Sequence, residues 1–206
     1  MQWTVLLPVK ALPAAKSRLA GFSADADAHA RLVHGIREDT LRAARTAPGV
    51  ARVVRISDVA DVDHELLQRR PGLNAALVEG ARHARDRWPS DGIAALVGDL
   101  PALTPGELGR TLATAAEHQT AFVADAAGTG TTLLTALPSA TLEPRFGRGS
   151  AARHGTKAVS LPAGPGLRHD VDTADDLRAA LLLGVGPCTL AALADQTSAA
   201  GRCRAS

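Results

Sequence analysis

The chain has 206 residues, of which 46% are hydrophobic and 21% are charged, so we expect one well-buried domain and exclude a disordered chain. Its 23 basic and 21 acidic residues are mixed along the sequence, and aromatic residues make up 2% of it. A polynucleotide partner is not expected, because the sequence offers neither a broad cationic face nor stacking platforms.

The first half of the chain alternates between predicted strands and helices. Residues 3–8 form a continuous apolar run, typical of a strand buried on both faces of a parallel sheet, and residues 50–56 predict a second strand. Residues 28–47 carry apolar side chains at helical spacing, and residues 73–87 predict another helix, entered through a Pro-Gly pair.

The second half continues this alternation. Residues 93–97 predict a third buried strand, and Thr104 is placed to cap a helix that has Pro105 in its first turn. Thr173, with Asp176 three residues later, predicts the start of a last helix through a capping box. Three further strands are predicted at residues 120–125, 131–137 and 158–161.

This order of elements predicts an α/β fold in three layers, with a mostly parallel sheet between helices. Sheets of this kind bind ligands at the carboxyl ends of their strands, so the functional residues are expected there. Residues 1–184 are expected to form the single domain. Residues 185–206 are rich in Ala, Thr and Ser and are expected to be a weakly ordered tail without a part in the chemistry.

A basic segment follows the first predicted strand. Lys10, Lys16 and Arg18 lie within nine residues, and such cations could neutralise a triphosphate; the alternative is a solvated basic loop. The pair Lys16-Ser17 after a strand also resembles the end of a P-loop. Both glycines which that motif requires are absent, so a P-loop is the weaker interpretation.

Acidic residues follow two later segments of the sheet. Asp99 comes directly after the third buried strand, where a carboxylate could bind a divalent cation or cap a turn. In an extended chain, Asp170 and Asp172 lie on one face while Val171 points into the core. Two carboxylates so close together favour a cation between them. The alternative is that Asp172 caps the next helix and Asp170 is solvated.

Two glycine-rich segments complete the candidate site. Residues 128–132 and 145–154 combine glycines with hydroxyl-bearing side chains, and the second segment opens a short predicted helix at Ser150. Backbone amides in such segments suit a small phosphate or carboxylate, although glycine-rich turns are also common for steric reasons.

The cysteines and the apolar runs indicate a cytoplasmic protein. Cys188 and Cys203 have no histidine at metal-ligand spacing, which argues against a zinc site or a disulfide framework. The apolar run at the N-terminus reaches Lys10 too soon for a signal peptide. The longest uncharged stretch, residues 179–194, is shorter than a membrane-spanning helix requires.

Several motifs occur in a fixed order along the chain: Pro8-Val9-Lys10, Ala15-Lys16-Ser17-Arg18-Leu19, Gly72-Leu73-Asn74-Ala75-Ala76-Leu77, Asp99-Leu100-Pro101, Gly128-Thr129-Gly130-Thr131-Thr132, Phe146-Gly147 with Ser150 and His154, and His169-Asp170-Val171-Asp172-Thr173. From about residue 3 to about residue 184, the sequence thereby resembles the 2-phospho-L-lactate/phosphoenolpyruvate guanylyltransferases. The resemblance implies a nucleotide-diphospho-sugar transferase-like fold, with residues 1–184 as the guanylyltransferase domain.

The resemblance also implies a role for each candidate residue. Asp99 and Asp172, with Asp170, would bind Mg²⁺. The triphosphate of GTP would lie against Lys10, Lys16 and Arg18, and the nucleoside against Leu73 and Asn74. The acceptor's phosphate and carboxylate would be held by Thr132, Gly147 and Ser150. The residues implied to be catalytic are Lys10, Lys16, Asp99 and Asp172. The chain lacks the Gly-x-Gly-x-Arg loop of sugar nucleotidyltransferases, so the triphosphate contacts of those enzymes do not transfer to it.

The implied reaction joins GTP to phosphoenolpyruvate or 2-phospho-L-lactate and releases pyrophosphate, giving an intermediate of coenzyme F-420 that could be handed to the next enzyme of the pathway. The Ala- and Arg-rich composition, typical of high-GC bacteria, favours phosphoenolpyruvate. The acceptor phosphate is already an anion, so we expect no histidine to act as an obligatory base. The alternatives are a molybdenum-cofactor-type or sugar-phosphate nucleotidyltransferase, and a nucleotide-binding regulatory module. The sequence leaves the oligomeric state open.

Overall fold

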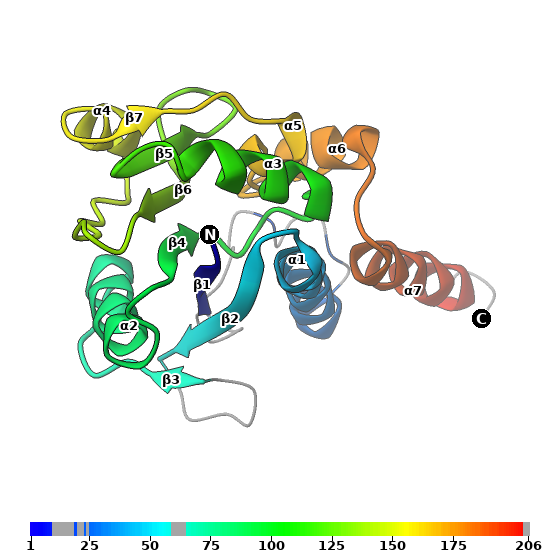
Figure 1. Ribbon diagram of the computed structural model, residues 1–206. Coiled ribbons are helices and arrows are strands. Elements are labelled where there is room, and N and C mark those ends of the chain that lie inside the picture. Colours follow the sequence, from blue (N-terminus) through cyan, green and yellow to red (C-terminus); the bar gives the residue numbers. More distant parts are fainter. Residues whose placement is uncertain (10–18, 20–22, 24, 59–64, 204–206) are drawn as a thin grey trace.

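The structure is a computed structural model that describes residues 1–9, 19, 23, 25–58 and 65–203, and for residues 196–203 it describes the backbone alone. The described residues form one seven-stranded sheet in the order β3-β2-β1-β4-β6-β5-β7, with helices packed on it (Figure 1). The strands are β1 Trp3–Val9, β2 Val50–Ser57, β3 Leu66–Leu67, β4 Gly92–Leu96, β5 Thr120–Ala124, β6 Thr131–Ala136 and β7 Val159–Ser160. The helices are α1 Ala26–Thr46, α2 Leu73–Arg87, α3 Pro105–Ala115, α4 Ser150–His154, α5 Pro165–Arg168, α6 Ala174–Leu183 and α7 Pro187–Cys203.

The sheet is mostly parallel, as predicted. Strand β1 lies in the middle and pairs in parallel with β2 and β4, and the pairs β2–β3 and β5–β7 are also parallel. Strand β6 is antiparallel to both of its neighbours, β4 and β5. The carboxyl ends of β1, β2 and β4 therefore lie at one edge of the sheet, where ligands bind in folds of this type.

The apolar run of β1 is buried on both faces of the sheet, which produces three layers. Val5 and Leu7 belong to a core that includes apolar residues of α1 and α3. Leu6 points to the opposite face and belongs to a second core, with apolar residues of α2 and α4. This alternation follows from the two-residue period of a strand, and it explains why the run carries no polar side chain except that of Thr4.

Local capping signals fixed two helix starts as predicted. Thr104 is the N-cap of α3 and forms a capping box with Glu107. Thr173 is the N-cap of α6 and forms a capping box with Asp176. In both boxes, the threonine hydroxyl accepts the N–H of the acidic residue in the first turn, and the acidic side chain accepts the N–H of the threonine.

The residues after 184, for which we expected a weakly ordered tail, contain helix α7, which lies beside α1 in Figure 1. Ala192 of α7 packs with Leu32 and Ile36 of α1 in a third apolar cluster. The two helices come very close at Gly35, where a Cβ atom would lie 2.7 Å from the carbonyl oxygen of Cys188. In the part of the chain that the structure describes, none of the helices is long and apolar enough to cross a bilayer.

Candidate active site

Asp99 follows β4 and is linked to the second acidic segment through the backbone. The N–H of Val171 donates to the carbonyl oxygen of Asp99 at 3.0 Å. Val171 itself is fully buried in the third apolar cluster. In an extended chain, its neighbours Asp170 and Asp172 point away from that cluster. Residues 72 positions apart in the sequence are thus joined at the carboxyl edge of the sheet, where they were predicted to meet.

Asp172 does not cap the helix that follows it. The N-cap of α6 is Thr173, and the carboxylate of Asp176 accepts the backbone N–H groups of Thr173 at 2.8 Å and of Asp172 at 3.1 Å. Asp172 contributes its backbone N–H to this cap. The alternative in which Asp172 serves as the N-cap is therefore wrong.

The carboxylates of this site influence one another. Burial, followed by the negative charges of Asp99 and Asp172 and a smaller contribution from Asp125, raises the pKa of Asp170 to about 7. Because such charge effects weaken with distance, Asp99 and Asp172 both lie near Asp170. A divalent cation among them would offset the repulsion and favour the charged form of Asp170. The residues present thus fit a cation chemically.

The described side chains do not already form a metal cage. Among them, no group of three His, Cys, Asp or Glu residues has an arrangement that could hold a metal ion. Magnesium is commonly bound by one or two carboxylates together with waters and substrate phosphates, not by a cage made of protein alone. A cation would therefore bind the carboxylates of Asp99, Asp170 and Asp172 together with groups from outside the protein.

The turn between β5 and β6 adjoins these carboxylates. Both carboxylate oxygens of Asp125 accept backbone N–H groups of this turn, from Thr129 and Gly130, each at 2.8 Å. The Arg168 guanidinium donates to the carbonyl oxygen of Asp125 at 2.9 Å. Because Arg168 is two residues before Asp170, this bond fixes the acidic segment against the glycine-rich turn.

A buried network joins that turn to α4. The N–H of Arg145 can only donate, so Nε2 of His154 accepts from it at 2.9 Å and carries no proton. The Nδ1–H of His154 then donates to Thr131 Oγ1 at 2.9 Å, and Ser150 Oγ donates to the same oxygen at 3.0 Å. Burial, with the charges of Arg153 and Arg145, lowers the pKa of His154 to about 4. This histidine is neutral, and hydrogen bonds engage both of its ring nitrogens.

Among the residues predicted to hold the acceptor, Thr132 and Ser150 differ in their hydrogen bonding. Thr132 is fully buried, and within the described residues its hydroxyl has no hydrogen-bond partner. Its carbonyl oxygen accepts the N–H of Val97, two residues before Asp99. The Ser150 hydroxyl donates to Thr131, as above. Gly147 has φ 118°, a backbone conformation that favours glycine.

The predicted nucleotide-binding and acceptor-binding segments are in direct contact. The Asn74 side chain accepts the N–H of Phe146 at 2.8 Å and donates to the carbonyl oxygen of Phe146 at 3.1 Å. Asn74 lies in the first turn of α2, and Phe146 precedes Gly147. The family resemblance implied that Asn74 lies near the nucleoside, and nothing in the sequence predicted that its side-chain amide would bind the backbone of Phe146, directly before Gly147.

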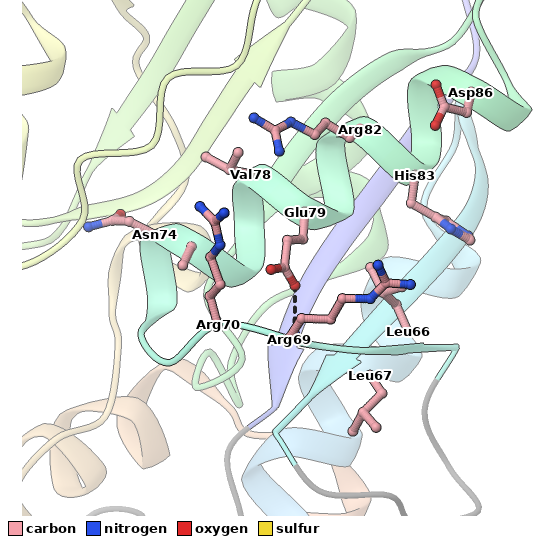
Figure 2. A pocket seen from close by; sticks show the side chains of 11 residues that line it. Leu66, Leu67, Arg69, Arg70, Asn74, Val78, Glu79, Arg82, His83 and Asp86 are labelled. Atoms are coloured by element: carbon pink, nitrogen blue, oxygen red, sulfur yellow. Dashed lines mark hydrogen bonds between the residues drawn. The ribbon is translucent and has the colours of Figure 1, made fainter.

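A groove of about 620 Å³ does not lie at the carboxylates. It runs along the outer face of α2, between that helix and the segment from β3 to α2, and Figure 2 shows Arg69, Arg70 and Arg82 around it. Its lining contains one predicted site residue, Asn74. We place the chemistry at the carboxylates, because none of Asp99, Asp170 and Asp172 lines this groove.

A second groove, of about 520 Å³, lies at the carboxyl ends of β1 and β2 and includes Val9 and Leu73 in its lining. It shares Arg69 and Arg70 with the larger groove. The basic segment begins directly after Val9. Its predicted triphosphate ligands lie outside the described residues, namely Lys10, Lys16 and Arg18.

Comparison with curated proteins finds close relatives along nearly the whole chain. A phosphoenolpyruvate guanylyltransferase of Streptomyces scabiei (strain 87.22) is 49% identical, with 94% of this chain and 97% of the relative covered. A phosphoenolpyruvate guanylyltransferase of Streptomyces coelicolor is 47% identical, with the same 94% and 97% covered. No family model matches the chain.

Solved structures share the fold at low sequence identity. A Desulfovibrio desulfuricans G20 protein described as a nucleotide-diphospho-sugar transferase has a TM-score of 0.66 and 17% identity, with 87% of this chain and 86% of that chain covered. A Mycobacterium tuberculosis H37Rv protein, crystallised in complex with manganese, has a TM-score of 0.54 and 18% identity, with 88% of this chain and 99% of that chain covered. These neighbours show that the fold is of the nucleotide-diphospho-sugar transferase type.

Proposed function

Because the chain belongs to the phosphoenolpyruvate guanylyltransferase family, we propose that it transfers the guanylyl group of GTP to the phosphate of phosphoenolpyruvate. The products are enolpyruvoyl-2-diphospho-5'-guanosine and pyrophosphate, in a cytoplasmic step towards coenzyme F-420. The meeting of Asp99 with Asp170 and Asp172 carries the chemical part of this proposal. The acceptor's identity rests on the names of the relatives.

In the proposed reaction, an oxygen of the acceptor phosphate attacks the α-phosphorus of GTP. A new P–O bond forms, the bond between the α-phosphorus and the bridging oxygen breaks, and pyrophosphate leaves with the electron pair. The nucleophile is already an anion, so no side chain has to remove a proton. The protein lowers the barrier by positioning and by neutralising charge.

The site is proposed to hold two anions side by side. Asp99, Asp170 and Asp172 would bind Mg²⁺, which when bound would neutralise charge on the reacting phosphates. The manganese complex of the Mycobacterium tuberculosis neighbour is consistent with a divalent cation in this fold. We assign the triphosphate to the segment that follows Val9, with Lys10, Lys16 and Arg18, and the nucleoside to the groove lined by Leu73.

The acceptor is assigned to the other side of the carboxylates. Thr132 supports this assignment, because a fully buried hydroxyl that lacks a partner among the described residues can donate to a ligand oxygen. The loop of Gly147, held by Asn74, lies on the same side of the sheet as α2. His154 is not assigned a catalytic role, since both of its ring nitrogens are already hydrogen-bonded.

Mass spectrometry of the product tests the proposal. The full chain is incubated with GTP, Mg²⁺ and equal amounts of phosphoenolpyruvate, 2-phospho-L-lactate and a sugar phosphate, and pyrophosphate release is followed in parallel. We expect enolpyruvoyl-2-diphospho-5'-guanosine as the main product. Asp172→Asn should lose activity by about 100-fold or more, because it removes a charged ligand. Asp175→Asn, which changes an exposed acid in the first turn of α6, should not.

Three outcomes would contradict the proposal. A dominant lactyl or sugar product would assign another acceptor to this site, and the absence of GTP turnover with every acceptor would favour a regulatory nucleotide-binding module. Full activity of a folded Asp172→Asn variant would remove the metal site from the mechanism.

A further inference from the structure

We infer that Thr40 and Asp39 of α1 are positioning residues for the metal-binding carboxylate Asp99, and that the start of α7 belongs to the same support. This inference rests on the proposed function, because it assumes that Asp99 binds a cation. It assigns a positioning role to residues after 184, which we had expected to form a tail without a part in the chemistry.

Thr40 holds the backbone directly after Asp99. Its hydroxyl is fully buried, accepts the N–H of Leu100 at 2.9 Å and donates to the carbonyl oxygen of Ile36 at 3.0 Å. The second bond fixes the orientation of the hydroxyl, so the lone pair that receives Leu100 has a defined direction. The loop that carries Asp99 is thereby attached to a helix 60 residues earlier in the chain.

The next residue of the loop is held from the opposite end of the chain. The carbonyl oxygen of Pro101 accepts the N–H of Gly186 at 2.9 Å, directly before α7 begins. Glycine is required at 186, because a Cβ atom there would collide with the Asp39 carboxyl group. The close approach of the two segments thus depends on a residue without a side chain.

Asp39 fixes α7 in the position that this contact needs. Its buried carboxylate accepts the N–H groups of Cys188 at 3.0 Å and Thr189 at 2.7 Å, both in the first turn of α7. A carboxylate at a helix N-terminus satisfies unpaired backbone donors and interacts favourably with the helix dipole. Asp39 therefore links α1 to the segment that binds Pro101.

Three consecutive residues of the loop are thus each tied to a different part of the chain. Asp99 is bound by Val171, Leu100 by Thr40 and Pro101 by Gly186. A carboxylate whose backbone is already held in place binds a cation more tightly, because less ordering is needed on binding. Loss of the groups that orient metal ligands typically lowers metal affinity or activity by about 10- to 100-fold.

The test measures metal binding without turnover. Mn²⁺ binding to the full chain is followed by electron paramagnetic resonance, with and without GTP, for wild type, Thr40→Val and Thr40→Ser. Valine keeps the shape of threonine but cannot accept from Leu100, so we expect the Kd for Mn²⁺ to rise about 10- to 100-fold. Serine keeps the hydroxyl and should remain near wild type.

Thr46→Val is the matched control. Thr46 lies on the same helix, and its hydroxyl also donates to the carbonyl oxygen four residues earlier, at 2.9 Å, but it is exposed at the end of α1. Thr46→Val should leave Mn²⁺ binding unchanged. Asp39→Asn provides a second, independent variant, and we expect it to weaken Mn²⁺ binding in the same direction.

The inference is overturned if Thr40→Val folds and still binds Mn²⁺ as wild type does, whether or not its thermal stability falls. If Thr40→Val does not fold, wild-type Mn²⁺ affinity in Asp39→Asn overturns it instead. Failure of the proposed function gives a different pattern: Mn²⁺ then binds wild type and Asp99→Asn equally, or binds neither.

Discussion

At the scale of single residues, the site disfavours the charged form of Asp170. It is half-buried beside two other carboxylates, and burial together with their charges raises its pKa to about 7. A metal-free protein at pH 8 must keep this group charged in an unfavourable environment. Sites that bind cations commonly store such repulsion, which the ion then relieves.

Asp170→Asn should therefore stabilise the metal-free protein. Asparagine removes the charge and keeps the shape, so the free energy of unfolding at pH 8 is expected to rise by about 1–3 kcal/mol. Urea denaturation in the presence of a chelator measures this change. Asp175→Asn, which removes an exposed acid from α6, serves as the control and should produce little change. A variant at 170 that is no more stable than wild type would mean that the carboxylates do not repel one another strongly.

His154 should make folding sensitive to acid. Its pKa is lowered to about 4 in the folded protein, from an ordinary value of 6.5, so between these values the unfolded chain binds a proton that the folded protein does not. The stability that neutral His154 contributes is complete above pH 6.5 and is lost as the pH falls towards 4, by up to about 3 kcal/mol.

The comparison of wild type with His154→Gln isolates this effect, because glutamine does not titrate. Urea denaturation between pH 7.5 and pH 4.5 should show the stability advantage of wild type shrinking as the pH falls. A difference that stays constant over this range would mean that the imidazole does not carry the acid sensitivity. The same variant should retain substrate turnover at neutral pH if it folds, since no base is required.

At the scale of elements, the first turn of α2 supports the loop on the acceptor side. Asn74→Ala removes two hydrogen bonds to the backbone of Phe146 and leaves partly buried groups without partners, which is expected to cost about 1–3 kcal/mol of stability. Because the loop carries Gly147, the KM for the acceptor should rise more than the KM for GTP. Gln119→Ala, at an exposed amide whose oxygen accepts the Ser139 hydroxyl, is the control for steady-state kinetics. An unchanged acceptor KM would separate Asn74 from this loop's function.

The predictability of each element depended on how local its signal was. The buried run of β1 and the capping boxes at Thr104 and Thr173 could be predicted, because neighbouring residues determine them. Strand β3 has two residues and α5 has four, too few for a periodic pattern. Helix α7 lacks a strong apolar stripe in its sequence, and its position depends on Asp39 and Gly35, which are distant in the chain.

The same distinction between local and distant signals applies to the candidate site. The sequence could place Asp99 at the end of a strand, at the edge of the sheet where ligands bind, and Asp172 directly before the helix that Thr173 caps. It could not predict that Leu100 binds Thr40, or that His154 is neutral with Nε2 facing the backbone of Arg145. Those contacts join side chains to backbone groups far away in the sequence, and no periodicity or spacing encodes them.

At the scale of the whole molecule, the sheet brings together three parts of the proposed site that come from separate parts of the chain. The groove at the ends of β1 and β2 lies on the side proposed for the nucleotide, and the loops after β6 and before α4 lie on the side proposed for the acceptor. The acidic residues come from the loops after β4 and before α6. This arrangement allows two negatively charged reactants to meet at one cation.

Anomalous scattering from crystals grown with Mn²⁺ and a non-hydrolysable GTP analogue tests that central claim most directly. We predict an anomalous peak in direct contact with the carboxylates of Asp99 and Asp172, between the acidic residues and the phosphates of the nucleotide. A nucleotide bound at the β1–β2 groove with its metal elsewhere, and with Asp99 and Asp172 outside coordination distance of that metal, would contradict the account.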